Sequence, residues 1–378
     1  MNRRNKRIAA ACTAIALLLC GCDQCVDGNV TADPAVVAHV VVYRAAERFA
    51  GWPANNGAWA WGNELLVGFT EGAFKDNLFG HDIDEWQPSY PRFARSLDGG
   101  ETWTVEVPSF LDAQGAEAAP RPPEGGIDFS HPGFAMTLRM VSSQSGFSRF
   151  YWSKDRGRIW EGPFALPDYG RKGIAARTDY LIDGPTTVSA FLTASKTNGK
   201  EGRPFVTRTE DGGLTWNFVG WITPEPEGFA IMPSTVRLAD GSLVSAIRYS
   251  GAEDKWIEIW GSADNGSTWT YLSTPAAQMG GNPPSMLQLP DSRLALTYGY
   301  RNCPAGIRAR LSDDGGRTWG REIILRADGG NWDVGYPRTL LREDGNLVTI
   351  YYFNDDAHAE RYIAATIWDP RRIESTPR

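Results

Sequence analysis

The chain has 378 residues, of which 42% are hydrophobic and 22% charged, and its formal net charge is −7 at pH 7. An acidic chain of this composition is a poor general binder of nucleic acid, and we expect no nucleic-acid partner. The 41 glycines are typical of a turn-rich β protein rather than of a helical one.

The first 21 residues are typical of a bacterial lipoprotein signal peptide. MNRRNKR is basic, IAAACTAIALLL is an apolar run too short to span a membrane, and Leu19–Cys22 (LCGC) resembles a lipobox. This pattern predicts cleavage before Cys22 and lipidation of that cysteine, with an ordinary signal peptide cut nearby as the alternative. Loss of the four cationic side chains in residues 1–21 would change the net charge to −7 − 4 = −11.

Residues 22–36 are expected to form a tether. The lipid would anchor the protein to a membrane of the bacterial cell envelope, where it would face the periplasm or the cell exterior. Cys25 and Cys303 would then be the other two cysteines of the mature chain, and the sequence leaves open whether they pair. No metal-ligand cluster is visible, so we expect no metal and no other cofactor.

The first predicted strand, residues 38–44 (AHVVVYR), is a spare strand that belongs to no repeat. Two long irregular insertions follow it, at residues 70–91 (TEGAFKDNLFGHDIDEWQPSYP) and around Pro108–Pro123. A third insertion, ILRADGGNWDVGYP, occupies residues 324–337. Loops of this kind, held by a rigid scaffold, are where binding and catalytic residues concentrate.

One motif occurs five times: a hydroxyl residue, any residue, Asp, any residue, Gly, two residues and Trp. The copies are SLDGGETW, SKDRGRIW, TEDGGLTW, SADNGSTW and SDDGGRTW, which start at residues 96, 153, 209, 262 and 312. Steps of 57, 56, 53 and 50 residues indicate a repeat architecture. Glycine permits positive φ, Asp and the hydroxyl accept turn N–H bonds, and the Trp ring fills space between sheets. We therefore expect these boxes to be structural rather than catalytic.

A hairpin signal lies upstream of later boxes. Its three copies are PSTVRLADGSLVSAIRY, PSMLQLPDSRLALTYGYR and PRTLLREDGNLVTIYYF, which start at Pro233, Pro284 and Pro337. Asp-Gly or Asp-Ser between alternating apolar residues predicts a tight turn between two strands. With one strand before the box and one after it, each repeat becomes a four-stranded antiparallel meander, and such sheets arranged radially form a β-propeller.

Five boxes predict five blades. Residues 336–368 supply three more strands without a box, and the strand at 38–44 would complete this sixth blade and close the ring. We therefore predict an all-β, six-bladed β-propeller with four-stranded antiparallel blades over residues 37–370, followed by a C-terminal tail at 371–378. In this topology the boxes and hairpin turns share one face, and the long insertions lie on the opposite face.

Three side chains are predicted to meet on the insertion face. Tyr336 precedes Pro337 at the start of an inner strand, where the sister repeats place Met232 and Pro283. Arg248 and Arg301 end the second strands of two neighbouring repeats. Because the planar guanidinium fork donates two parallel hydrogen bonds to a carboxylate, this trio predicts an anion clamp around a phenol. The alternative is two solvated rim arginines and a packing tyrosine.

Five Asp-boxes on a six-bladed plan resemble the sialidase (neuraminidase) superfamily, whose members are also called BNR-repeat proteins. The resemblance covers residues 37–370. It implies a retaining glycoside hydrolase with a tyrosine nucleophile assisted by a glutamate, three arginines for the substrate carboxylate, and an aspartate as acid/base. By this resemblance Tyr336 is the nucleophile, and Arg248 and Arg301 are the second and third arginines.

The sequence departs from the family pattern at two positions. Gly51 stands where the first arginine is expected, and Met232 stands where the glutamate is expected. The acid/base loop corresponds to FGHDIDEW, in which His81, Asp82 and Asp84 are candidates. Asp333 lies three residues before Tyr336 and is a candidate base for it. Trp332 is a candidate to stack on a sugar ring.

Three functions are consistent with these residues. The first is an exo-acting glycoside hydrolase that cleaves a terminal acidic sugar from extracellular glycans, with a glycan as partner and a monomer as the working state. The second is a uronate-directed polysaccharide lyase in which Tyr336 or His81 abstracts a proton. The third is a non-catalytic glycan-binding propeller.

Overall fold

The computed structural model describes residues 30–77, 80–112 and 117–374. The chain divides into two units, Met1–Val30 and Thr31–Arg378, and the second holds every described strand. The predicted signal segment and Cys22 lie outside the described residues, as does Cys25, whereas Cys303 forms a disulfide. In the part of the chain that the structure describes, no helix has the length and hydropathy needed to cross a membrane.

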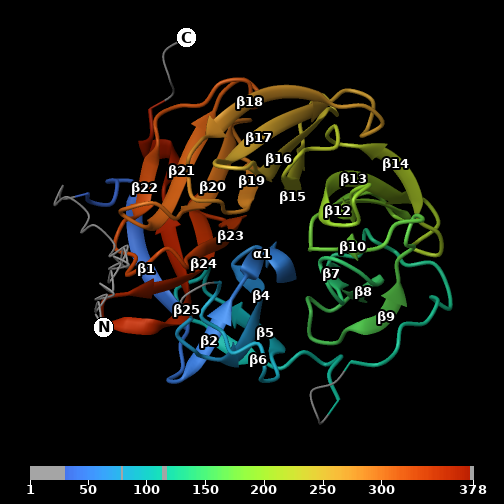
Figure 1. Ribbon diagram of the computed structural model, residues 1–378, viewed down its shortest axis with the longest axis horizontal. Coiled ribbons are helices and arrows are strands. Elements are labelled where there is room, and N and C mark those ends of the chain that lie inside the picture. The colour runs from blue at the N-terminus through green and yellow to red at the C-terminus, as the bar shows by residue number, and fades with distance from the viewer. Residues whose placement is uncertain (1–29, 78–79, 113–116, 375–378) are drawn as a thin grey trace, which may run out of the picture. The chain divides into compact units, whose positions relative to one another are not determined.

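Six antiparallel sheets follow one another around a ring and form the blades of a β-propeller (Figure 1). The predicted fold class is therefore confirmed. The first blade contains the inner strands β2 (Arg48–Gly51) and β3 (Ala58–Trp61), then β4 (Glu64–Ala73), β5 (Tyr90–Ser96) and β6 (Thr104–Glu106). The four-residue helix α1 (Pro53–Asn56) lies between β2 and β3.

The third to fifth blades follow the predicted meander. The strands of the third blade are β10 (Ile174–Ala175), β11 (Tyr180–Gly184), β12 (Thr187–Ser195), β13 (Glu201–Thr209) and β14 (Asn217–Trp221). Those of the fourth blade are β15 (Phe229–Arg237), β16 (Leu243–Ser250), β17 (Lys255–Ser262) and β18 (Thr270–Ala276). Those of the fifth blade are β19 (Pro284–Gln288), β20 (Leu294–Tyr300), β21 (Gly306–Ser312) and β22 (Ile323–Arg326).

The sixth blade joins the two ends of the propeller. It contains β23 (Gly335–Leu341), β24 (Leu347–Asp355), β25 (His358–Trp368) and, at its outer edge, β1 (Val36–Tyr43). β1 pairs antiparallel with β25 from Val36 opposite Trp368 to Tyr43 opposite Ile363. The N-terminal strand therefore closes the ring as predicted, and the one-turn 3-10 helix Pro370–Arg372 follows β25.

The second blade departs from the four-stranded prediction. Among the described residues its sheet contains only β7 (Ala135–Met140), β8 (Ser148–Ser153) and β9 (Glu161–Ala165). The inner edge of β7 is satisfied by side chains of the third blade, because the N–H groups of Met136 and Leu138 donate to Tyr180 Oη (3.1 Å) and Thr178 Oγ1 (3.0 Å). The side-chain oxygens of a tyrosine and a threonine thus accept hydrogen bonds that the backbone of an inner strand would otherwise accept.

Each Asp-box closes the turn between the last two strands of its blade, which is the turn predicted between the third and fourth strands of a repeat. In the first box, Ser96 Oγ accepts the N–H of Gly100 (2.7 Å) and Asp98 Oδ1 accepts the N–H of Thr102 (2.9 Å). Gly99 and Gly100 have φ of 75° and 95°, which L side chains rarely adopt. The indole N–H of Trp103 donates to Gly100 O (2.9 Å), which turns the ring back toward the blades.

Among the described residues the core consists of six apolar clusters, one between each pair of adjacent blades. The cluster between the sixth and first blades includes Val42, Phe69 and Ile363, so ring closure is sealed by apolar packing as well as by hydrogen bonds. The box tryptophans lie in or against five of the six clusters; they are Trp103, Trp160, Trp216, Trp269 and Trp319. The boxes therefore connect neighbouring sheets.

Candidate active site

Three blades present a residue in a left-handed conformation before a proline. Trp52, Met232 and Tyr336 have φ of 61°, 56° and 50°, although a residue before proline normally adopts extended backbone. At Met232 and Tyr336 the strand register shifts between Ile231 and Ser234 and between Gly335 and Arg338, which marks β-bulges. The three side chains share one buried cluster at the channel. Backbone strain of this kind is typical of functional sites.

The predicted trio meets in the structure. Arg248, from β16, donates a hydrogen bond through Nη1 to Tyr336 Oη (3.1 Å). The guanidinium carbons of Arg248 and Arg301 lie 5.8 and 5.6 Å from the centre of the Tyr336 ring. Tyr336 itself is only 9% exposed. A buried phenol therefore lies between two cations from the fourth and fifth blades.

The charges around Tyr336 favour its phenolate. Burial alone raises the pKa of this phenol, but the guanidinium groups of Arg248, Arg301 and Arg177 together lower the pKa below its ordinary value of 10. Arg177 follows β10 in the third blade and was not predicted from the sequence. Arg177 is the third cation near Tyr336, and it comes from a different blade than the first arginine of the family pattern. Glu201 forms an ion pair with Arg177 (Oε1 to Nη1, 2.5 Å).

Arg301 is held rigidly. Its Nη2 donates to Tyr352 Oη (2.7 Å), its Nη1 to Gly281 O (3.1 Å) and its Nε to Val334 O (3.2 Å). Its guanidinium also lies 5.1 Å from the centre of the Trp332 ring, which is 42% exposed. Among the described residues Arg248 has no carboxylate within ion-pair distance. The pair can therefore receive a ligand anion.

Asp333 is the centre of a buried polar network rather than a partner of Tyr336. Its carboxylate accepts hydrogen bonds from Tyr352 Oη (2.6 Å), Arg361 Nε (3.1 Å) and the N–H of Asp82 (3.1 Å), and it binds His81 Nδ1 (2.5 Å). Burial raises the pKa of Asp333, but His81, Arg361 and Tyr352 outweigh it and hold the pKa well below its usual range. In the described part of the chain, the Asp333 carboxylate therefore serves to bind His81 and Arg361.

His81 faces Tyr336 from the first-blade loop. Its ring centre lies 5.9 Å from that of Tyr336, 5.2 Å from that of Trp52 and 6.0 Å from that of Trp332. Because the ionised Asp333 accepts the Nδ1 proton, Nε2 is the nitrogen left for proton exchange. The histidine–aspartate pair therefore has the arrangement of an oriented acid/base group.

The other two candidates in the FGHDIDEW loop, Asp82 and Asp84, bind groups other than Tyr336. Asp82 is buried, binds Arg361 and accepts the N–H of Asn77 (2.9 Å). Asp84 accepts the N–H of Trp86 (3.1 Å) and lies 3.9 Å from Lys75 Nζ. Of the three predicted candidates, only His81 contacts the phenol.

Gly51 and Met232, the two positions that depart from the family pattern, are closely packed against neighbouring side chains. A Cβ on Gly51 would lie 2.4 Å from the Phe49 ring, so this position leaves no room for an arginine without movement of Phe49. Met232 is buried, and its Sδ lies 3.9 Å from Arg248 Nη1. A sulfur atom therefore contacts the arginine where a carboxylate was expected.

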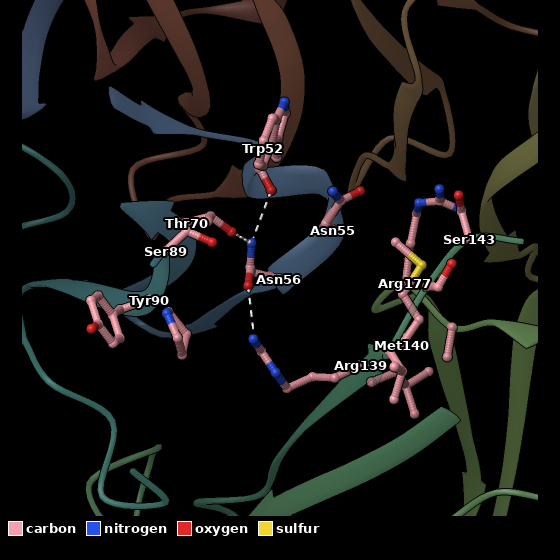
Figure 2. Close-up of a pocket in the computed structure, with 15 residues that line it drawn as sticks. Trp52, Asn55, Asn56, Thr70, Ser89, Tyr90, Arg139, Met140, Ser143 and Arg177 are labelled. Carbon is pink, nitrogen blue, oxygen red and sulfur yellow. Dashed lines mark hydrogen bonds between the residues drawn. The ribbon is translucent and has the colours of Figure 1, made fainter. Parts of the chain in front are cut away.

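A cavity of about 400 Å³ is lined by residues of the first three blades, among them Trp52, Arg139 and Arg177 (Figure 2). Its walls come from α1, the ends of β4 and β7, and the segment after β10. Trp52 and Arg177 line the cavity and also belong to the surroundings of Tyr336. In the described part of the chain, no group of three or more His, Cys, Asp and Glu side chains could hold a metal ion.

Sequence comparison assigns the repeat to a known family. A model of the BNR repeat-like domain matches residues 129–349, which is more than half of the chain. This chain belongs to the BNR repeat-like family. The predicted resemblance to sialidases with Asp-boxes is thereby confirmed, and no curated protein matches the sequence.

Solved structures with this BNR repeat-like fold include several glycoside hydrolases. A Dyadobacter fermentans protein of unknown function is 23% identical over 89% of this chain and 100% of its own, with a TM-score of 0.70. The NanB sialidase of Streptococcus pneumoniae (K499G mutant) is 11% identical over 89% and 71%, with a TM-score of 0.58. The α-L-arabinanase of Penicillium chrysogenum, complexed with arabinobiose, is 15% identical over 90% and 100%, with a TM-score of 0.58. At these identities the likeness shows the fold alone.

Proposed function

We propose that this BNR repeat-like protein is an exo-acting glycoside hydrolase that removes a terminal acidic sugar from extracellular glycans. The observation that carries the proposal is the buried phenol of Tyr336 between the guanidiniums of Arg248 and Arg301. Guanidiniums bind carboxylates through paired hydrogen bonds, and a phenol that ionises only beside these cations is repelled less by an anionic sugar than a carboxylate nucleophile would be.

The local charge supports an anionic substrate. Around Tyr336 the cations Arg248, Arg301, Arg177 and Arg361 face the carboxylates of Glu201, Asp333 and Asp82, which leaves 4 − 3 = +1, and this sum is unchanged with Tyr336 ionised and His81 protonated. A substrate carboxylate bound by Arg248 and Arg301 would neutralise this excess. Trp332 would cover one face of the sugar ring, since its exposed indole lies beside Arg301.

The mechanism is a double displacement. The Tyr336 phenolate, whose charge Arg248 and Arg301 balance, attacks the anomeric carbon as the bond to the leaving oxygen breaks, and protonated His81 gives its Nε2 proton to that oxygen. His81 then takes a proton from water, whose oxygen attacks the anomeric carbon and releases Tyr336. Two inversions retain the anomeric configuration. Asp333 holds the His81 ring in place throughout.

A uronate-directed lyase is the second candidate. The oriented His81–Asp333 pair favours it, because Nε2 of such a histidine is placed to abstract a proton while the arginines neutralise the neighbouring carboxylate. The two reactions differ by one water in the mass of their products. Only the lyase reaction creates a carbon–carbon double bond that absorbs ultraviolet light.

Incubation of the purified protein with sialylated oligosaccharides and with uronic-acid-capped oligosaccharides tests the proposal. Mass spectrometry of the products should show a released acidic sugar with one added water, and NMR should show retained anomeric configuration. An unsaturated product would favour the lyase instead. Binding without any product across both glycan sets would favour a non-catalytic propeller and contradict the hydrolase.

We also propose that the mature protein is tethered to the cell envelope through lipid on Cys22. The basic segment, the short apolar run and the LCGC box support this placement. Metabolic labelling with a palmitate analogue should mark the wild-type protein and not Cys22→Ala. A Cys22→Ala protein that stayed labelled and membrane-bound would contradict the anchor.

A further inference from the structure

Tyr352 occupies in the sixth blade the strand position that Arg248 occupies in the fourth. Each is the sixth residue of its strand, in LVSAIR of β16 and LVTIYY of β24. Arg248 lies opposite the residue before the bulged Met232. In the same way, Tyr352 lies opposite the residue before the bulged Tyr336. The repeat therefore carries a polar side chain to the site from this position in both blades.

The Tyr352 hydroxyl lies between two groups of opposite charge. Its oxygen accepts a hydrogen bond from Arg301 Nη2 (2.7 Å), and its proton is donated to Asp333 Oδ1 (2.6 Å). Arg301 Nη2 and Asp333 Oδ1 lie 4.0 Å apart, which is too far for a direct hydrogen bond. Because a guanidinium can only donate and an ionised carboxylate can only accept, the two charges fix the direction of both hydrogen bonds.

This hydroxyl keeps its proton. Burial raises the pKa of Tyr352 well above its ordinary value of 10; Arg301 opposes the rise, and Asp333 and Tyr336 add to it. In contrast, the pKa of Tyr336, whose ring centre lies 5.8 Å away, is lowered. Of these two neighbouring phenols, Tyr352 is therefore the neutral one, and it places an uncharged group between a cation and an anion.

The donors of Arg301 show what this separation preserves. A guanidinium has five N–H groups. Val334 O, Gly281 O and Tyr352 Oη accept one each, which leaves 5 − 3 = 2, one on each terminal nitrogen, for a ligand carboxylate. A direct ion pair with Asp333 would neutralise the Arg301 guanidinium and draw Nη2 away from the ligand.

The same separation preserves the orientation of the acid/base group. Asp333 Oδ1 is bound by His81 Nδ1 (2.5 Å) as well as by Tyr352 Oη. The other oxygen, Oδ2, accepts from Arg361 Nε (3.1 Å). If Arg301 bound Oδ1 directly, it would compete with His81 for that oxygen, and the carboxylate would hold the imidazole less firmly.

We propose that Tyr352 is a positioning residue whose neutral hydroxyl separates the Arg301 cation from the carboxylate that orients His81. Without this hydroxyl, Arg301 and Asp333 form a direct ion pair, and the ligand carboxylate loses a hydrogen-bond donor. The inference rests on the proposed function in one respect, that Arg301 receives the carboxylate of an acidic sugar. The separation of the two charges in the ligand-free protein does not depend on that function.

Calorimetry with small acidic glycosides tests the effect on the ligand. Methyl α-sialoside and methyl β-glucuronide are titrated into the Tyr336→Phe protein, so that no turnover interferes. Addition of Tyr352→Phe should weaken binding by about 10-fold or more, as expected for the loss of one hydrogen bond to a charged group. The matched control is Tyr351→Phe, which should leave the affinity unchanged. Tyr351 is also completely buried on β24, but its hydroxyl binds Thr366 Oγ1 (2.6 Å).

The Asp333→Asn background distinguishes charge separation from a general packing defect. In this background Arg301 has no carboxylate at position 333 to pair with, so Tyr352→Phe should change the affinity for the same probe by less than about threefold. An effect of equal size in both backgrounds would overturn the proposal. So would an unchanged affinity on addition of Tyr352→Phe alone.

A crystal structure of the ligand-free Tyr352→Phe protein tests the separation without any probe. Arg301 Nη2 should move to within about 3 Å of the Asp333 carboxylate. A separation that stays at 4.0 Å, with water in place of the hydroxyl, would overturn the proposal. Failure of the proposed function would appear differently, as absence of sugar release by the wild-type protein and of binding by both probes, and this structure would then decide the role of Tyr352.

Discussion

At the scale of single residues, the proposed chemistry depends on the phenol of Tyr336 and the cations around it. Arg248 donates to the phenol oxygen at 3.1 Å, and its charge helps to lower the pKa of that group despite burial. The phenolate would therefore be present at lower pH than for an ordinary tyrosine, and the acid limb of the activity profile would report its pKa.

Substitution Arg248→Gln should raise the pKa of Tyr336, because it removes the cation that favours the phenolate most strongly. Ultraviolet difference spectra should show the low-pKa tyrosine of the wild type titrating at higher pH in the variant, and the acid limb of kcat/KM should move the same way. Arg317→Gln, in an exposed box turn, is the control. An unchanged titration would show that Arg248 does not set this pKa.

Asp179 is predicted to make stability depend on pH. Burial raises the pKa of this carboxyl to about 7, against the opposing effect of Arg338. Because the folded-state pKa is raised, the contribution of the protonated Asp179 carboxyl to the free energy of unfolding is fully present below about pH 4. This contribution is lost as pH rises through 7, and the loss reaches roughly 4 kcal/mol. Asp179→Asn should therefore stabilise the protein at pH 8 much more than at pH 4 in urea unfolding.

The control for this titration is Asp356→Asn, which changes an exposed carboxylate. Its free energy of unfolding should follow that of the wild type at both pH values. If Asp179→Asn gave the same difference from wild type at pH 4 and pH 8, the carboxyl would not be titrating in this range.

At the scale of elements, the Asp-box is a local structure that the sequence specifies almost completely. Asp314 accepts the N–H groups of Arg317 (3.0 Å) and Thr318 (2.8 Å) and the hydroxyl of Thr318 (2.6 Å). All of these partners lie within four residues. Turn and hairpin positions were predictable for this reason, because glycine, aspartate and hydroxyl side chains act on their own backbone.

Asp314→Ala should destabilise the protein by about 1–3 kcal/mol, since the turn loses four hydrogen bonds to one carboxylate. Asp313→Ala changes the exposed neighbour in the same box and should alter the free energy of unfolding by less than about 0.5 kcal/mol. Urea unfolding measures both. Sugar release should be unaffected by either change, and loss of activity in a stably folded Asp314→Ala protein would contradict a structural role for the box.

The second blade shows where local patterns stop being sufficient. Its box predicted a four-stranded unit, yet the N–H groups of β7 are satisfied by Thr178 and Tyr180, which lie about 40 residues further along the chain. Nothing in the local sequence indicates this exchange. The missing inner strand was therefore not predictable from the motif.

At the scale of the whole molecule, ring closure brings together residues that are far apart in sequence. His81 and Asp333 are separated by 252 positions. Tyr336, Arg248 and Arg301 could be placed from the repeat register, because each has a counterpart in a sister hairpin. Arg177 and Arg361 could not, because they belong to no motif and only the closed ring places them near the site.

Val42→Asp tests the closure itself. Val42 is 5% exposed and packs between the sixth and first blades, whereas Val41 on the same strand is 54% exposed. A carboxylate at position 42 would be buried without a partner and should cost several kcal/mol, while Val41→Asp should be nearly neutral. Equal unfolding midpoints for the two variants in urea would show that β1 does not seal the ring.

The central claim is that Tyr336 attacks the sugar. An acidic-sugar fluoride with a second fluorine beside the anomeric carbon forms the covalent intermediate and slows its hydrolysis, so it should trap the labelled enzyme. Peptide mass spectrometry should then locate the sugar on Tyr336, and the Tyr336→Phe protein should remain unlabelled and inactive. Sugar release by Tyr336→Phe at the wild-type rate, or a label on another residue, would contradict the account.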